Sequence, residues 1–413
     1  MRTRSTLRLW GRTYPPFASA LAKQGAALDE LDGAGGVETR LIEISDLEHR
    51  VLDGDLALSG ESDVLLLNTD WLPRCVERGL LLDVKDRLVA DPPVGWPDAW
   101  VPSLRELQEG ENGAIYGLPY HDGPMMVLFR RDLFEEHGIS DGFSARFGYQ
   151  LAPPETWDEF IDQAEFFTDR ESGRWGTIFA GYPDAHNNVY DFLTQLWGRG
   201  GDVIDGSANP SLDTAAALAA AEWLSDLWQR RHIVNPSAAG WDSVASGLHF
   251  AAGEAALMVN WCGFASLAAD PSSPVHGRLG CAPVPGVAGG TRVTMNSYWI
   301  LAIPKGSRQP DRAWKFLRST ASPEMDRVTA EEGATAVRRD TWGDRAVRSS
   351  APYYEALEDA HRHSRSVWRD PRWPAVADVL NVFMSHIVAG IGEPRSCLER
   401  AQEQLASLLK RGV

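Results

Sequence analysis

The sequence predicts an α/β protein built from two domains. Its first 68 residues alternate short apolar runs with helical patterns, the order that gives a parallel sheet with right-handed crossovers. A chain of 413 residues is long enough for two or three domains. Hydrophobic residues make up 44 % of the chain and charged residues 23 %, as in globular proteins.

The N-terminal part is expected to form a sheet that is covered on both faces. The run VLLL at 64–67 is continuously apolar, which is typical of a strand with helices on both sides. Strands are predicted at 6–10, 37–44 and 63–68, with helices at 17–31 and 47–58 between them.

The residues at the end of the third strand are candidate ligand contacts. Open α/β sheets bind ligands at the carboxyl ends of their strands, and here Asn68 is followed by Thr69, Asp70 and Trp71. Either Thr69 or Asp70 is expected to cap a helix at 71–78.

The segment 113–136 is expected to be a crossing between the two domains. A short strand is predicted at 114–116, and a second apolar run follows at 125–129. Between them, the break Tyr120-His121-Asp122-Gly123-Pro124 carries a phenol, an imidazole and a carboxylate. Such a polar, aromatic break between buried strands is typical of a crossing that also lines a cleft.

Strands and helices continue to alternate after this crossing. A loop is predicted at 143–154, followed by a helix in which Thr156 and Glu159 form a capping box. Ser396 and Glu399 are expected to cap the last helix. Further strands are predicted at 175–180, 255–259 and 300–303, and further helices at 189–199, 213–231, 244–250 and 310–318, with another beginning at Ser322-Pro323.

Charge, cysteine content and motifs exclude several classes of protein. The net charge of −17 argues against binding to nucleic acid or to an anionic membrane surface. The chain contains no apolar run of 18 residues, so no membrane-spanning helix is predicted. The four cysteines form no metal-binding pattern, so no metal is expected, and free thiols are favoured over a Cys262–Cys281 bridge. No GxSxG, HExxH or phosphate-loop motif is present, so neither catalytic residues nor a cofactor are predicted.

Five stretches of the chain, taken together, resemble the family 1 extracellular solute-binding proteins, the sugar-receptor subunits of ABC importers. In chain order they are DVLLLNTDW with GLLLDV, YGLPY with VLFRRDLF, PPETWDEF, FAAGEAALMVNWCGF and AWKFL. This is also their order in the family. The resemblance implies a two-lobed periplasmic-binding-protein fold of type II, whose discontinuous α/β lobes close over a ligand.

The resemblance also implies the domain limits, the partners and the location of the protein. Partners are a small-molecule ligand, expected to be a sugar, and the permease subunits of an ABC transporter, with the protein itself a monomer. The N-terminal residues are too polar for a signal peptide, so either a leader has been removed or the protein is cytoplasmic; the resemblance favours removal and an extracytoplasmic location. The expected limits are 1–122 with 283–335 for the N-terminal lobe and 123–282 with 336–413 for the more helical C-terminal lobe, with crossings near 119–126, 280–287 and 333–338.

Candidate ligand-binding residues follow from sugar chemistry and from position in the family pattern. Sugars present apolar C–H faces and a rim of hydroxyls, which suit aromatic rings and planar polar groups. The candidates are Arg12, Tyr14, Asp70, Trp71, Tyr120, His121, Asp122, Tyr182, Asn187, Asn260, Trp261, Asn296, Ser297, Tyr298, Trp299 and Arg338.

Other solutes and one enzyme class remain alternatives. Arginines in the site, such as Arg12 or Arg338, would favour a sugar acid or a sulfonated or phosphorylated sugar. Several carboxylates without arginine would favour a polyamine. A glycoside hydrolase would need a pair of carboxylates around the scissile bond, and no distinctive pair is found. The bulky residues 295–298, where the family commonly has small ones, favour a small ligand.

Overall fold

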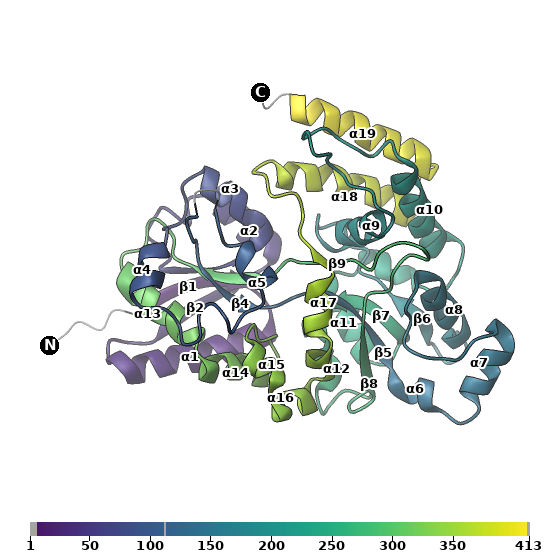
Figure 1. Cartoon of the computed structure of the whole chain (residues 1–413), viewed down its shortest axis with the longest axis horizontal. Helices are drawn as coiled ribbons and strands as arrows, with labels where there is room; N and C mark the ends of the chain where they lie inside the picture. The colour runs from purple at the N-terminus through teal and green to yellow at the C-terminus, as the bar shows by residue number, and fades with distance from the viewer. Residues whose placement is uncertain (1–5, 111–112, 411–413) are drawn as a thin grey trace. The chain divides into compact units, whose positions relative to one another are not determined.

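The computed structural model describes residues 6–110 and 113–410 and divides the chain into two compact units (Figure 1). Unit 1 comprises residues 1–123, 296–350 and 369–371, and unit 2 comprises residues 124–295, 351–368 and 372–413. Residues 1–5, part of the N-terminus that the sequence predicts to be too polar for a signal peptide, lie outside the described part.

The unit boundaries differ in part from those expected. The first lies between residues 123 and 124. The next two lie at 295/296 and 350/351, later than the crossings expected near 280–287 and 333–338, and residues 369–371 return briefly to unit 1. Residues up to 295 stay with unit 2 because the Thr294 hydroxyl donates to the Met125 carbonyl at 2.7 Å. Residues up to 350 stay with unit 1 because α15 and α16 pack against α14.

Unit 1 is built around a five-stranded sheet with the strand order β2-β1-β3-β10-β4. β1 is parallel to β2 and β3, whereas β10 is antiparallel to both β3 and β4. β1, β3 and β4 therefore end at the edge of the sheet where β10 begins. The strands are β1 (Leu7–Arg12), β2 (Val37–Ile42), β3 (Val64–Asn68), β4 (Leu118–His121) and β10 (Trp299–Ala302).

Helices pack against this sheet, and β3 is buried at every residue, as its apolar sequence predicts. The helices of unit 1 are α1 (Pro15–Asp32), α2 (Ile44–Leu52), η1 (Thr69–Trp71), α3 (Leu72–Glu77), α4 (Lys85–Ala90), α5 (Ser103–Glu106), α13 (Pro310–Thr320), α14 (Pro323–Glu331), α15 (Arg339–Gly343) and α16 (Arg345–Ser350).

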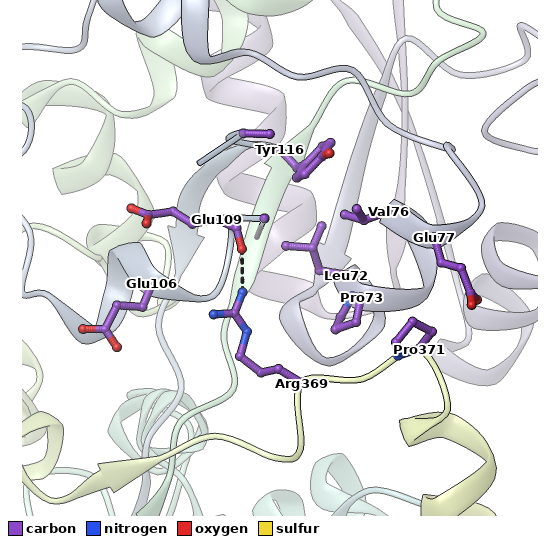
Figure 2. Close-up of a pocket in the computed structure, with 11 residues that line it drawn as sticks. Leu72, Pro73, Val76, Glu77, Glu106, Glu109, Tyr116, Arg369 and Pro371 are labelled. Carbon is purple, nitrogen blue, oxygen red and sulfur yellow. Dashed lines mark hydrogen bonds between the residues drawn. The ribbon is translucent and has the colours of Figure 1, made fainter. Parts of the chain in front are cut away.

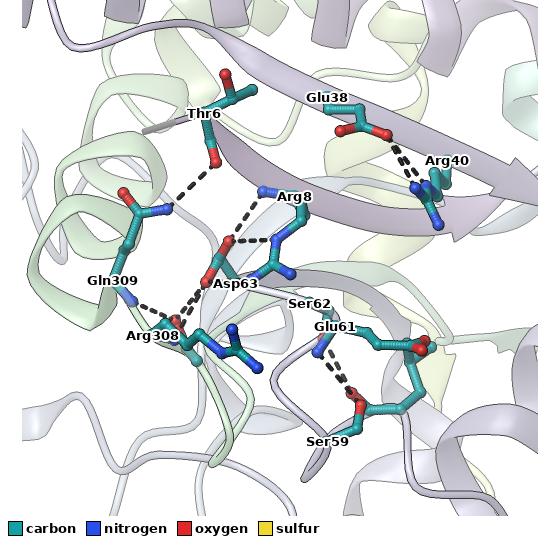
Figure 3. Close-up of polar contacts among 12 residues, drawn as sticks. Thr6, Arg8, Glu38, Arg40, Ser59, Glu61, Ser62, Asp63, Arg308 and Gln309 are labelled. Atoms are coloured by element: carbon teal, nitrogen blue, oxygen red, sulfur yellow. Dashed lines mark hydrogen bonds and ion pairs between the residues drawn. The ribbon is translucent and has the colours of Figure 1, made fainter. Parts of the chain in front are cut away.

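Asp63, just before β3, connects three segments of unit 1 (Figure 3). Its buried carboxylate accepts hydrogen bonds from the Arg8 backbone amide at 3.1 Å and the Arg8 Nε at 3.2 Å. It also accepts from the Ser307 hydroxyl at 3.3 Å and the Arg308 amide at 3.2 Å. One carboxylate thus holds β1 and the 307–308 turn against the start of β3.

Unit 2 contains a four-stranded sheet with the order β6-β7-β5-β8. β7 is parallel to β6 and antiparallel to β5, so β6 and β7 end at the edge where β5 begins. A separate parallel pair joins β9 to β11. The strands are β5 (Met125–Arg130), β6 (Trp175–Ile178), β7 (Ala255–Trp261), β8 (Leu279–Pro283), β9 (Thr294–Met295) and β11 (Ser364–Arg365).

The helices of unit 2 enclose most of its core, and α18 and α19 pack side by side at the C-terminal end (Figure 1). They are α6 (Arg131–Glu135), α7 (Ile139–Phe147), α8 (Trp157–Phe167), α9 (Asn187–Gly198), α10 (Ala215–Gln229), η2 (Pro236–Gly240), α11 (Ser243–Ala251), η3 (Cys262–Phe264), α12 (Ala265–Ala269), η4 (Pro352–Glu355), α17 (Leu357–Arg362), α18 (Trp373–Ala389) and α19 (Pro394–Lys410).

Local hydrogen bonding confirms some predicted helix ends and corrects others. The capping box of Thr156 and Glu159 is present. The predicted cap by Thr69 or Asp70 is wrong, because the Asn68 side chain accepts from the Asp70 amide at 2.9 Å. The predicted cap at Ser396 is also wrong, since α19 already begins at Pro394, a residue suited to the first helical position.

Two segments differ from the prediction for reasons of packing. A loop is predicted at 143–154, but residues 143–147 belong to helix α7. Phe143 is buried against Phe147 and Phe166, and this packing favours the helix. The strand predicted at 114–116 is absent: Ile115 forms only an isolated bridge, and β4 begins at Leu118.

Candidate ligand-binding residues

In unit 1, aromatic rings gather at the edge where β1, β3 and β4 end. Trp299 is the first residue of β10 and is paired with Asn68 on one side and His121 on the other. Its ring meets that of Trp71 edge-on at 5.8 Å, and the Arg12 guanidinium lies 5.7 Å from its centroid. Trp71 is only 1 % exposed, and its Nε1 has no hydrogen-bond partner among the described residues.

His121 is a neutral hydrogen-bond donor at this edge. Its Nδ1 accepts the Thr335 backbone N–H at 2.8 Å, so the ring proton must be on Nε2. Burial, and then the positive charge of Arg12, lower the pKa of His121 to about 3. Tyr14 lies beside this ring, with centroids 6.0 Å apart.

A polar network positions the side chains that follow β3. The Asn68 Oδ1 accepts from the Asp70 amide and from the Ser297 hydroxyl, the latter at 3.0 Å. Asp70 and Ser297 are buried at the same edge of the sheet as Trp299. Asn296 is held separately, donating from Nδ2 to the Ser103 carbonyl at 3.0 Å.

Three predicted residues of unit 1, Tyr120, Tyr298 and Asp122, are engaged in its interior. The Tyr120 hydroxyl donates to Gln24 Oε1 at 3.0 Å, and the Tyr298 hydroxyl donates to Gln108 Oε1 at 2.7 Å. Asp122 is fully buried and accepts from the neighbouring amide of residue 123. These bonds account for the burial of the three polar side chains, so their burial gives no reason to expect a ligand beside them.

Arg338, predicted as a contact for an anion, is only 2 % exposed. Its Nε and Nη2 donate to the Asp340 carboxylate at 2.9 and 2.8 Å, and Nη1 donates to two backbone carbonyls. The guanidinium also lies 4.7 Å from the Trp100 ring. Together with Tyr120, Tyr298 and Asp122, it is left out of the site considered below.

In unit 2, Trp261 is the last residue of β7 and is held in a defined orientation. Its Nε1 donates to Asn187 Oδ1 at 2.9 Å, and its ring meets Tyr190 edge-on at 5.6 Å. Asn260 supports the strand end, donating to the Ser243 carbonyl and accepting from the Trp261 amide at 2.8 Å. The partly buried Trp261 ring is therefore fixed by both strand and helix.

The loop before α9 positions Asn187. The Asp184 carboxylate accepts from the amides of His186 and Asn187 and from Asn187 Nδ2. Ala185 has a φ of 61°, a left-handed conformation that is uncommon for non-glycine residues. Tyr182, predicted as a ligand contact, is 49 % exposed.

Sequence reasoning missed three side chains of this cluster: Asp184, Tyr190 and Asp191. Asp191 is only 7 % exposed, and burial, followed by the charge of Asp184, raises its pKa well above the ordinary value. The signal that could have found Tyr190 and Asp191 is their spacing, three and four residues beyond Asn187 on one helical face.

Unit 1 also contains a pocket of about 630 Å³ that the sequence did not predict (Figure 2). Arg369 reaches into it and donates to the Glu109 carbonyl at 2.6 Å. None of the predicted ligand residues lines it, although Leu72 directly follows Trp71. Its wall combines apolar and acidic residues: Leu72, Pro73, Val76, Glu77, Glu106, Glu109, Gly110, Ala114, Tyr116, Arg369 and Pro371.

Several further features bear on function. None of the four cysteines, all of which lie in the described residues, forms a disulfide. Across residues 6–110 and 113–410, no group of three or more His, Cys, Asp or Glu side chains is arranged to hold a metal ion. None of the helices in those ranges has the length and apolarity needed to cross a membrane.

Comparisons with known proteins place this geometry in a family. The model of the bacterial extracellular solute-binding protein family matches residues 32–326. A mannitol-binding protein of Pseudomonas aeruginosa is 24 % identical over 285 residues, which cover 68 % of this chain and 62 % of the relative.

Solved structures show the same fold. A solute-binding protein from Agrobacterium radiobacter K84 in complex with ribitol has a TM-score of 0.86 and 21 % identity, covering 98 % of this chain and 99 % of that one. The T. maritima MalE3 protein with bound maltose has a TM-score of 0.85 and 23 % identity, covering 99 % and 100 %. The fold is therefore the predicted two-lobed periplasmic-binding-protein fold of type II.

Proposed function

The chain belongs to the family of bacterial extracellular solute-binding proteins, and we propose that it is the substrate-binding protein of an ABC importer that captures a carbohydrate. It would act outside the cytoplasm, as a monomer, and deliver its ligand to permease subunits. No catalytic step is part of this proposal.

The observation that carries the proposal is the chemistry at the strand ends of both units. Unit 1 presents Trp299 beside Trp71 and a neutral His121, and unit 2 presents Trp261 beside Asn187. Aromatic faces cover the C–H surface of a sugar, while amide and imidazole groups bond its hydroxyls. Both sets lie where α/β sheets bind ligands.

A small ligand, a monosaccharide or a polyol, fits this arrangement best. Relatives with the same fold were solved with ribitol and with d-mannitol. In this chain Met295 and Asn296 are buried just before β10, and bulky residues there would leave room for a small ligand. Arg338 gives no support to an anionic ligand, because its donors are already bonded within unit 1. The support for an anion that is left comes from Arg12, which lies beside the Trp299 ring.

We infer that a ligand bonded to residues of both units favours a closed arrangement of the chain. A ligand can shift such an equilibrium only through contacts that differ between the two states. Residues on both sides of the 123/124 crossing would supply those contacts.

Thermal unfolding with a panel of neutral monosaccharides, polyols, disaccharides, sugar acids and polyamines tests the proposal. A ligand present at 100 times its Kd stabilises the folded state by about 2.7 kcal/mol, which raises the midpoint clearly. We expect a rise with a monosaccharide or polyol. A rise with none of them, or product release from a nitrophenyl glycoside, would overturn the proposal.

A further inference from the structure

Three polar side chains of α9 share one face of the helix in unit 2. Asn187, Asp191 and Thr194 are spaced i, i+4 and i+7, so they lie in a row along the helix. The first member of the row, Asn187, accepts from the Trp261 Nε1 at 2.9 Å. The row therefore starts beside the residue that we propose to stack on the ligand.

The second and third members of this row lack partners. In the part of the chain that the structure describes, no hydrogen bond or ion pair reaches the Asp191 carboxyl. The Thr194 hydroxyl is likewise buried without a hydrogen-bond partner among the described residues. A buried carboxyl without a partner is costly, so one that is retained needs an explanation.

Two other buried carboxyls, those of Asp63 and Asp326, accept several hydrogen bonds. Asp63 accepts from Arg8, Ser307 and the amide of residue 308, and Asp326 accepts from the amides of Val337 and Arg338. Asp191 differs from these two residues, because no hydrogen bond reaches its carboxyl among the described residues.

The charged groups near Asp191 do not provide a counterion. Its electrostatic neighbour is the Asp184 carboxylate, which has the same charge. His186 donates from Nδ1 to the Asp184 carbonyl at 2.6 Å and interacts electrostatically with Asp378, another acid. The surroundings are thus rich in carboxyls, and a cation brought by a ligand would be favoured.

We propose that Asp191 determines specificity by binding a protonated amino group of the ligand, which is an amino sugar or an amino polyol. The inference rests on the proposed function and narrows its substrate class. The amine would form a charge-assisted bond with the carboxylate, Thr194 would bond a neighbouring hydroxyl, and Trp261 would cover the apolar face of the same molecule.

Matched pairs of probes test the proposal with the full-length protein. Calorimetric titrations at about pH 6, where aliphatic amines are protonated, compare d-glucosamine with d-glucose and N-acetyl-d-glucosamine, and 1-amino-1-deoxysorbitol with sorbitol. We expect the amine of at least one set to bind about tenfold more tightly than its neutral counterparts.

Two variants locate the effect. Asp191→Asn keeps the size of the side chain and is expected to remove the preference for the amine while retaining binding of the neutral partner. Asp213→Asn, the same change at an exposed position of unit 2, is expected to leave the preference intact.

The outcomes separate this inference from the proposed function. Neutral probes that bind as tightly as the amines in the unmodified protein would overturn the inference and leave the function standing, even if the Asp191→Asn variant does not fold. An amine preference that persists in folded Asp191→Asn would overturn the role of Asp191. Binding of no probe in this set or in the wider panel would overturn both.

Discussion

At the residue scale, hydrogen bonds fix the ring of Trp261, which we propose to contact the ligand. Trp261 is anchored through Asn187 and through its own amide, so its ring has little freedom to move. A pre-oriented ring loses little conformational entropy when a ligand stacks on it. Fixing this ring would therefore contribute to affinity if a ligand stacks on it.

Replacing Trp261 by alanine is expected to weaken ligand binding by ~1–3 kcal/mol, because the stacking surface is lost. Titration of the ligand found by thermal unfolding measures this change. Trp223→Ala is the matched control: it removes a partly buried tryptophan of unit 2 that packs on Trp157, outside the site. Equal affinities of the two folded variants would exclude Trp261 from the site.

His121 is expected to make the protein sensitive to acid. Its pKa is lowered to about 3 in the folded state, so between about pH 6.5 and that value the unfolded chain binds more protons. The free energy of unfolding therefore falls as the pH is lowered through this window.

Asp326 acts in the opposite direction. Burial raises the pKa of Asp326 to about 6, so below that pH the folded chain binds more protons at this carboxyl than the unfolded chain does. Asp326 therefore increases the free energy of unfolding as the pH falls through this range. His121→Asn retains an acceptor for the Thr335 amide but cannot titrate. Urea unfolding between about pH 7 and pH 4 should show a smaller loss of stability in this variant than in the unmodified protein. Parallel curves would contradict the role of His121.

Asp63 illustrates a residue whose role is purely structural. Asp63→Ala leaves the amides of residues 8 and 308 and the Arg8 guanidinium without their acceptor (Figure 3), and we expect a loss of roughly 2–3 kcal/mol in the free energy of unfolding. Glu38→Ala removes a half-exposed ion pair with Arg40 in the same unit and should cost less than ~1 kcal/mol. If urea unfolding showed similar losses of stability for Asp63→Ala and Glu38→Ala, the structural role of Asp63 would be contradicted.

At the element scale, the contact between α8 and β6 depends on the absence of a side chain at Gly176. A Cβ at this position would lie 2.0 Å from the Ala164 carbonyl oxygen, and backbone must move to make room for it. Gly176→Ala is therefore expected to lower the free energy of unfolding by ~1–3 kcal/mol.

Gly206→Ala is the control for this prediction. A Cβ at Gly206 meets no atom within 4 Å, so the substitution should be close to neutral. Urea unfolding of both variants provides the comparison. If Gly176→Ala were as stable as Gly206→Ala, the close approach of helix and strand would be wrong.

At the scale of the whole molecule, each unit contributes its own cluster at the ends of its strands. If one ligand bonds to both clusters, the chain becomes more compact when the ligand binds. Small-angle X-ray scattering should then show a smaller radius of gyration at saturation, and Trp261→Ala should need more ligand to reach it. An unchanged radius at saturating ligand would contradict closure.

Much of the fold was predictable because its signals are local. The apolar run of β3, the capping box at Thr156 and the proline at the start of α14 each act within a few residues. Helix α7 was not predictable, because it depends on the packing of Phe143. The unit boundaries were not predictable either, because they depend on bonds such as that from Thr294 to Met125.

The sequence by itself determined the family, the alternation of strands and helices and the positions of the tryptophans at strand ends. Only the tertiary structure decided which polar groups are already satisfied: Arg338 has its partners within unit 1, whereas Asp191 has none among the described residues. The physical reason is that a side chain's residue type gives its bonding capacity, but its partners come from segments far away in the chain.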